Sequence, residues 1–393
     1  MKRNLLLLLS LLAFLSCEEG PQKGSFAYDV DFLSTKKETI VLQENGGQSQ
    51  VLVVPDYQGR VMTSTANGET GNSYGWLNYD LISSGEIQPQ INAVGGEDRF
   101  WLGPEGGQYS IFFKAGDDFT FDNWQTPAAI DTETFQTVGH SQKEAVFEKQ
   151  FKLTNYQNFT FDVKVNRKVE ILDKAEVKSA LGSFIPANLS YVGFATTNTI
   201  TNVGETPWAK ETGLLSIWIL GMFKPSPQTN IIIPFKSELA LNTAYFGEIG
   251  EDRLQTKDDL VFFSGDGKYR SKIGLPANNA TGVLGSYDAA QNVLTIVQYS
   301  FTGDASYVNS LWEMQEAPYA GDAVNAYNDG PLDNGSQLGP FYELESSSPA
   351  KELKPGEQVT HIHKTFHFEG AKEGLDAICN QVFGIDIDQI KLD

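Results

Sequence analysis

Cysteine is nearly absent from this sequence of 393 residues, which contains only Cys17 and Cys379. Two cysteines so far apart exclude a small fold held together by a disulfide framework. Basic residues are also few: 29 Lys and Arg stand against 50 Asp and Glu, and the net charge is −21. Because phosphate binding needs basic patches, we expect no nucleic-acid partner. Histidine is scarcer still, with four residues, so each one is a candidate for a specific role.

Long apolar runs are missing except at the N-terminus, where residues 5–15 are apolar apart from one serine and follow Lys2 and Arg3. This run is too short to span a bilayer. A basic start, a short apolar run and a small residue after it are the features of a signal peptide. The sequence therefore predicts a signal peptide over residues 1–16.

The residues after this run indicate a lipid anchor. Ser16 followed by Cys17 resembles a bacterial lipobox, which implies that Cys17 becomes the lipid-modified N-terminus and that residues 17–25 form a tether. Glu18 and Glu19 resemble the acidic export signal of bacterial surface lipoproteins, which implies anchoring to the outer membrane, on its periplasmic or cell-surface face. A plain secretory signal with an incidental cysteine is the alternative.

Short strand-like segments recur along the rest of the chain. Residues 39–42 and 50–54 surround a Gly-rich turn, and residues 159–171 show a long apolar/polar alternation, as expected of strands. Helical patterns are confined to residues 174–181 and 375–382. From Phe26 onward we therefore predict strands and an all-β sandwich or barrel, folded as one domain over residues 26–393.

Two predicted strands near the C-terminus, residues 341–346 and 359–368, gather ionisable side chains. Strand alternation places Glu343 and Glu345 on one face of the first strand. It places His361, His363 and His367, three of the four histidines, on one face of the second. A carboxylate beside an imidazole is a common acid–base pair, so we expect these polar faces to converge on one solvent-accessible hollow. The alternative is an ordinary solvated face of two half-buried strands.

The same segment carries a resemblance to a known family. Leu344-Glu345-Ser346, followed by a short loop, Pro355-Gly356-Glu357 and His361, resembles the C-terminal signature of the galactose mutarotase-like (aldose 1-epimerase-like) superfamily. The resemblance implies a β-supersandwich with few short helices and a glutamate base, which is Glu345 here. The family also has a mid-chain histidine acid, whereas no histidine lies between His140 and His361. We therefore expect His361 or His363 to act as the acid, or the chain to bind sugar without chemistry.

The Gly-rich run at residues 92–107 is a candidate sugar contact. Glu97, Arg99 and Trp101 follow Gly95-Gly96, and a pyranose ring stacks on an aromatic face while its hydroxyls bond to charged groups. This run also resembles a segment of mutarotase-like proteins. The alternative is a turn with an internal ion pair and a buried tryptophan.

Basic residues cluster at Lys268, Arg270 and Lys272, which share a face of a predicted strand. With Glu343 as a further substrate contact, Lys272 would meet an acidic sugar such as a uronate or a sulfated glycan. A solvated strand face is the alternative. His361 and His363 with Glu343 or Glu345 also offer nitrogen and oxygen ligands that zinc accepts, although the sequence assigns no metal or other cofactor.

Together these features predict a carbohydrate-binding lipoprotein with epimerase- or mutarotase-type acid–base chemistry. Two alternatives stay open: a non-catalytic glycan-binding surface lipoprotein, and a metal-assisted glycan lyase or hydrolase.

Overall fold

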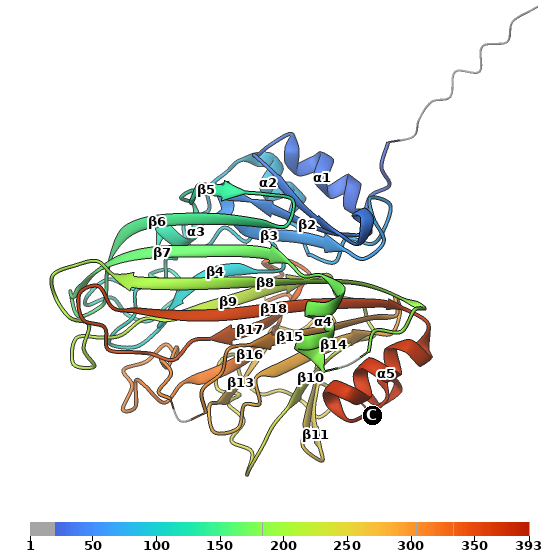
Figure 1. Ribbon diagram of the computed structural model, residues 1–393. Coiled ribbons are helices and arrows are strands. Elements are labelled where there is room, and N and C mark those ends of the chain that lie inside the picture. The colour runs from blue at the N-terminus through green and yellow to red at the C-terminus, as the bar shows by residue number, and fades with distance from the viewer. Residues whose placement is uncertain (1–19, 183, 304, 333, 393) are drawn as a thin grey trace, which may run out of the picture.

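The computed structural model describes residues 20–182, 184–303, 305–332 and 334–392, so the predicted signal peptide and Cys17 lie outside the described residues. Strands dominate this part of the chain, as the predicted all-β class requires (Figure 1). The α-helices are α1 (Phe26–Ser34), α2 (Tyr79–Ser84), α3 (Ala128–Asp131), α4 (Lys174–Leu181) and α5 (Lys372–Phe383). Short 3₁₀ turns cover Asn45–Gly47, Pro55–Tyr57 and Ile387–Gln389. None of the helices in the described ranges is long and apolar enough to cross a membrane.

The largest sheet has ten strands, and neighbouring strands are antiparallel. Its strands, in spatial order, are β11 (Leu254–Lys257), β12 (Leu260–Ser264), β10 (Thr229–Pro234), β14 (Val283–Asp288), β15 (Val293–Tyr299), β18 (Gln358–Gly370), β8 (Leu189–Asn202), β7 (Thr160–Ile171), β6 (Glu144–Thr154) and β5 (Gln136–His140).

Two smaller antiparallel sheets complete the fold. The five-stranded sheet has the order β13 (Ser271–Pro276), β16 (Asp322–Asn328), β17 (Tyr342–Ser347), β9 (Ser216–Phe223) and β4 (Arg99–Gly103). The three-stranded sheet consists of β1 (Ile40–Glu44), β2 (Ser49–Val54) and β3 (Arg60–Thr65), and lies beside α1 and α2 (Figure 1).

The core lies between the ten-stranded and five-stranded sheets. Phe161 of β7 and Phe194 of β8 belong to the same buried cluster as Ile217 and Ile219 of β9. Burying one such side chain contributes about 1.5–3 kcal/mol. Alternation along β7 produces this arrangement, since every second residue from Phe161 is buried, as the sequence pattern predicted.

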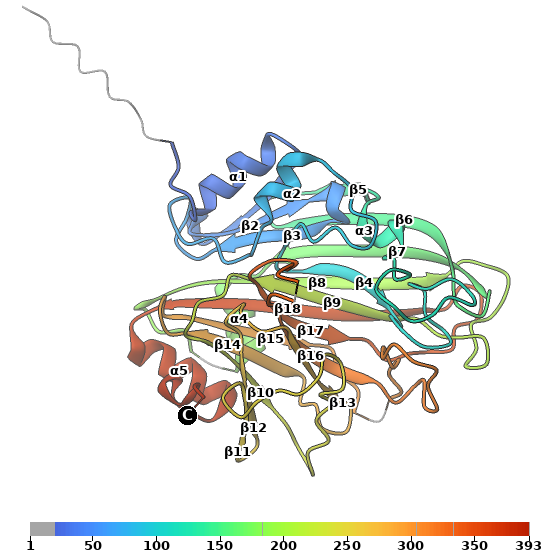
Figure 2. The same cartoon turned by 180° about the vertical axis from the view of Figure 1, so that it is seen from behind.

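Helices cover the other face of the ten-stranded sheet. Val177 of α4 and Ile378 of α5 pack with Ile296 of β15 and with Phe366 and Phe368 of β18. Figure 1 shows α4 and α5 on this side, and Figure 2, seen from behind, shows the loops that follow β4 on the opposite side. The central strands of the ten-stranded sheet are therefore buried on both faces, a fact that decides the position of the histidines.

One local prediction is wrong: the chain from Phe26 begins with helix α1, not with a strand. The side chain of Ser25 caps this helix by accepting a hydrogen bond from the backbone N–H of Tyr28. Phe26 and Leu33 then lie one above the other on a buried face, which is the seven-residue spacing of an amphipathic helix.

Candidate functional site

One face of the five-stranded sheet forms the floor of a cavity of about 1190 Å³. The antiparallel register aligns the side chains of this face in rows. Arg99 of β4 lies opposite Leu220 of β9, and Leu220 lies opposite Glu345 of β17. In the next row Glu343 of β17 lies opposite Tyr327 of β16. The other floor residues that line the cavity are Trp101, Trp218, Met222 and Lys272.

Loops from distant parts of the sequence supply the walls, and these walls are rich in aromatic rings. The wall residues include Ile91, Trp124, Tyr245, Phe246, Trp312 and Phe341. The ring of Trp124 lies 6.4 Å from that of Trp101 and 5.8 Å from that of Trp312. The cavity thus presents flat apolar surfaces next to charged groups, which is the chemistry that a pyranose ring with its hydroxyls can use.

A buried ion pair holds the middle of the floor. The Nζ of Lys272 donates hydrogen bonds to both carboxylate oxygens of Glu345, at 3.0 and 2.9 Å, and the indole Nε1 of Trp218 donates to the same carboxylate at 2.9 Å. Burial alone would lower the pKa of Lys272, but the charges of Glu345 and Glu105 outweigh it and the pKa is raised. Lys272 is therefore a fixed cation whose charge Glu345 balances.

Arg99 and Glu343 lie beside this pair with incomplete hydrogen bonding. Arg99 Nη2 is 3.6 Å from Glu343 Oε1, and the guanidinium stacks 4.1 Å from the ring centre of Trp101. Within the described part of the chain, Arg99 Nε, Arg99 Nη1 and Glu343 Oε1 are buried without a hydrogen-bond partner. Burial raises the pKa of Glu343 to about 8, the charge of Glu345 adds to this rise, and Arg99 and Lys272 oppose it.

Glu105 is a second carboxyl with an altered pKa, and sequence reasoning missed it. It follows β4 in a loop and lines the same cavity. Desolvation raises the pKa of Glu105 to about 7, although the nearby charge of Lys272 lowers it. The only sequence feature that points to Glu105 is its place in the Gly-rich run at residues 92–107, because the alternation of side chains along a strand does not extend into a loop.

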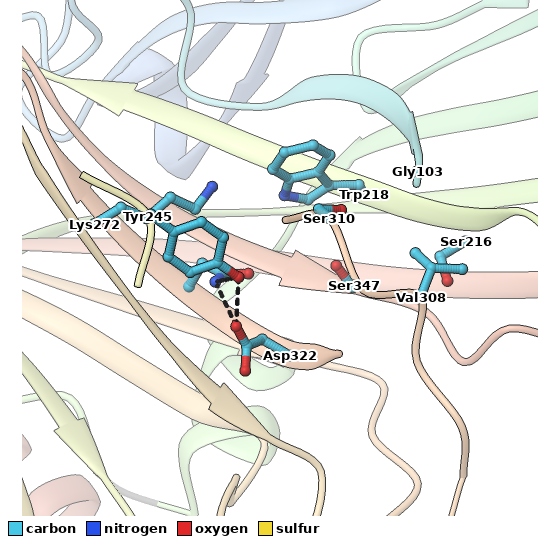
Figure 3. Close-up of a pocket in the computed structure, with 10 residues that line it drawn as sticks. Gly103, Ser216, Trp218, Tyr245, Lys272, Val308, Ser310, Asp322 and Ser347 are labelled. Atoms are coloured by element: carbon cyan, nitrogen blue, oxygen red, sulfur yellow. Dashed lines mark hydrogen bonds between the residues drawn. The ribbon is translucent and has the colours of Figure 1, made fainter. Parts of the chain in front are cut away.

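A small hollow of about 10 Å³ adjoins the cavity and shares Trp218, Tyr245, Lys272 and Ser310 with it. Figure 3 shows the phenol of Tyr245 directed at the carboxylate of Asp322, which accepts its hydrogen bond. Asn242, from the same loop as Tyr245, donates to Asp322 at 2.9 Å. These bonds attach the wall loop to β16.

The prediction that the histidines share this hollow with the glutamates is wrong. Ser346 follows Glu345 on β17 and therefore points to the opposite face of the strand. The Oγ of Ser346 forms hydrogen bonds with His361 Nε2 and with His363 Nδ1, both at 2.8 Å. Burial lowers the pKa of His361 to about 3 and that of His363 to about 4. Both imidazoles are neutral residues of the interior between the sheets, because β17 and β18 belong to different, stacked sheets.

The prediction for Glu97 is also wrong, since its side chain lies between the sheets. Its carboxylate accepts hydrogen bonds from the backbone N–H and the hydroxyl of Ser64, and it lies 2.9 Å from His367 Nε2. Glu97 precedes β4 at a bend after two glycines with positive φ, so the alternation that places Arg99 and Trp101 in the cavity does not apply to it.

The residues predicted as alternative metal ligands do not lie together in the structure. His361 and His363 lie on the far side of β17 from Glu343 and Glu345. The described residues contain no group of three or more His, Cys, Asp or Glu side chains that could hold a metal ion.

The basic cluster divides between the cavity and solvent. Lys272 and Arg270 line the cavity, and Lys268 is exposed. The guanidinium of Arg270 stacks 4.3 Å from the ring centre of Phe246, at the loop that carries Tyr245.

Comparison with known proteins shows the family and the fold. A model of a family described as a family of unknown function (DUF6786) matches residues 24–393. No curated protein matched the sequence. A galactose mutarotase-like protein from Lactobacillus casei ATCC 334 has a TM-score of 0.50 at 10% identity, over 84% of this chain and 100% of that chain. The Slr1438 protein of Synechocystis sp. PCC 6803 has a TM-score of 0.50 at 11% identity, over 85% of this chain and 96% of that chain. The mutarotase-like fold that the sequence resemblance predicted is thus confirmed.

Proposed function

This chain belongs to the DUF6786 family, and we propose that its large cavity binds a carbohydrate. The observation that carries the proposal is a set of buried polar atoms that belong to residues lining the cavity and have no hydrogen-bond partner among the described residues. They are Arg99 Nε, Arg99 Nη1, Arg270 Nε, Trp101 Nε1, Trp124 Nε1 and Glu343 Oε1. Buried polar groups without partners are costly, so a ligand rich in hydroxyls would satisfy them.

The dimensions of the cavity suit a saccharide of more than one ring. Drug-sized ligands occupy pockets of about 300–1,000 Å³, and this cavity measures about 1190 Å³. Trp124 and Trp312 in the wall and Trp101 in the floor offer stacking surfaces for neighbouring rings.

Glu343 and Glu105 take the roles of acid and base in the proposed chemistry. A carboxyl group whose pKa lies near neutral pH can both hold and release a proton there. The pKa values of about 8 for Glu343 and about 7 for Glu105 meet this condition. In an epimerase-type reaction Glu105 accepts the proton of the anomeric hydroxyl, Glu343 donates one to the ring oxygen, and the bond between C1 and the ring oxygen breaks. Return of the protons closes the ring on the other face.

The predicted base Glu345 has a different role in this proposal. It lies beneath the cavity lining, and Lys272 and Trp218 occupy both of its oxygens. We assign it to holding Lys272 in place.

The test combines a binding measurement with a turnover measurement. We expect mono- and oligosaccharides to raise the unfolding free energy, by about 2.7 kcal/mol at a hundredfold excess over Kd. Glu343→Gln should abolish the interconversion of anomers, followed by NMR, while changing affinity less than about threefold. Glu313→Gln, at an exposed position of the cavity lining, is the matched control. If no saccharide binds, the proposal fails; if sugars bind without turnover in the wild type, the chain is a binding protein.

We also propose that Cys17 carries the lipid that anchors the protein to the outer membrane. The support is the predicted signal peptide with its lipobox-like end. Mass spectrometry of the mature N-terminus should detect acylated Cys17, and Cys17→Ser should release the protein from membranes. An unmodified mature N-terminus would contradict the anchor.

A further inference from the structure

We propose that the saccharide carries a carboxylate or sulfate group and that the guanidinium of Arg99 binds this anion. The inference rests on the proposed carbohydrate function and specifies the class of sugar. It follows from the balance of donors and acceptors on the cavity surface and from the charges around Arg99.

Hydrogen-bond donors greatly outnumber acceptors among the unpartnered buried atoms of the residues that line the cavity. Five of these atoms are N–H donors, on Arg99, Arg270, Trp101 and Trp124, and the sixth is a carboxyl oxygen of Glu343. A sugar hydroxyl brings a donor with each acceptor, whereas a carboxylate or sulfate brings only acceptors. An acidic sugar therefore matches this surface better than a neutral sugar does.

Arg99 is the donor placed best for an anion. Its side chain is 2% exposed, and stacking on Trp101 fixes the plane of the guanidinium. In the described residues its sole carboxylate within ion-pair distance is Glu343, at 3.6 Å through Nη2, and Nε and Nη1 are buried there without a hydrogen-bond partner. Charge-assisted bonds from arginine to planar oxyanions are among the strongest that side chains form.

Burial lowers the pKa of Arg99, and four acids, Glu343, Asp131, Glu345 and Glu105, act in the opposite direction. Glu345 is engaged by Lys272, and Asp131 accepts hydrogen bonds from the backbone and the side chain of Asn92. The raised pKa of Glu343 keeps this carboxyl mostly protonated at neutral pH, where it is a further donor. On the floor itself the cations Arg99 and Lys272 thus face one ionised carboxylate, Glu345, which Lys272 already engages, so an incoming anion would meet a positive surface.

Arg270 gives the anion a second contact at the cavity wall. Its Nε is buried without a partner in the described part of the chain, and its guanidinium stacks on Phe246. An extended acidic saccharide can reach both arginines, whereas an isolated anion can occupy only one site at a time.

The experiment compares sugars that differ only in the acidic group. Isothermal titration calorimetry of the full chain would use galacturonate against galactose, trigalacturonate against galactotriose, and galactose 6-sulfate against galactose. We expect the acidic member of at least one pair to bind tenfold or more tightly. The uronate and sulfate arms show which anion is preferred.

Arginine variants test the assigned contact. Arg99→Gln should weaken the binding of the acidic sugar at least tenfold. It should weaken the binding of the corresponding neutral sugar less than twofold. Arg270→Gln, at a partly exposed position, provides the same test if Arg99→Gln does not fold. Arg253→Gln is the matched control, because Arg253 also stacks on an aromatic ring and pairs with a carboxylate but lies outside the cavity.

The outcomes separate this inference from the proposed function. Neutral sugars that bind as tightly as their acidic partners would overturn the inference and leave the carbohydrate function standing. An equal loss of affinity in Arg99→Gln and Arg253→Gln would also overturn it, since only the net charge would then matter. If no sugar of either kind binds, the proposed function itself fails.

Discussion

Glu343 gives the protein a dependence of stability on pH that one substitution should remove. Its carboxyl is buried, and its pKa rises from the usual 4.5 to about 8. Between these values the folded chain retains a proton that the unfolded chain has released, so raising the pH through this window favours unfolding. Each pH unit in this window corresponds to about 1.4 kcal/mol. The free energy of unfolding of the wild type therefore falls by on the order of 5 kcal/mol across the window, whereas Glu343→Gln is spared this loss.

The other charges that face Glu343 are present in both proteins. They are Glu345 on the same strand, Arg99 on β4, Lys272 on β13 and Asp329 beyond β16. Urea denaturation at several pH values from about 4.5 to about 9 would yield the free energy of unfolding of each protein. The advantage of Glu343→Gln should grow with pH and level off above about 8, whereas the control Glu313→Gln should follow the wild type. A difference that stays constant across this range would refute a buried, protonated Glu343.

Three further substitutions test other parts of the structure. Lys272→Met should lower the free energy of unfolding in urea by about 3–5 kcal/mol, because it leaves the buried carboxylate of Glu345 without its partner. Lys164→Met, in an exposed pair with Glu148, should lower it by less than about 1 kcal/mol. Similar losses for both would count against the buried pair. His361→Gln should lower the free energy of unfolding by about 1–3 kcal/mol. It should change saccharide affinity, measured by calorimetry, by less than about twofold. A loss of affinity at unchanged stability would place the imidazole in the cavity. Gly95→Ala should lower the melting temperature more than Gly85→Ala. Both glycines have positive φ, but only at Gly95 would an added Cβ clash with the carbonyl oxygen of Trp76. Equal shifts in melting temperature would argue against this close approach.

Sequence reasoning worked where a local rule fixes the structure. Alternation and turn residues identified the strands, and the helix predicted over residues 174–181 is α4, which Asp173 and Glu176 begin with a capping box. Helix α1 was missed although Ser25 caps it, because its large apolar residues, Phe26, Tyr28, Val30 and Phe32, alternate with small or acidic ones as in a strand.

The candidate site was predictable in part. The sequence marked Arg99, Trp101, Lys272 and Glu343 as separate candidate substrate contacts, and the structure brings all four to the cavity. Strand alternation tells which side chains share a face of a strand. It does not tell which sheet the strand joins or what that face packs against. The histidines were misplaced for this reason, since the polar face of β18 turned out to be the packed interior between two sheets.

Strand β17 works as a partition between two chemically opposite compartments. One set of alternate residues carries carboxylates toward the cavity, and the other carries Ser346 toward neutral imidazoles. Inserting a single residue before Glu343 would exchange these sets and drive two acids into the region around His361. Hydrogen bonding to β16 on one side and to β9 on the other locks the strand against such slippage. The residue count along this partition is therefore fixed by the chemistry on its two faces.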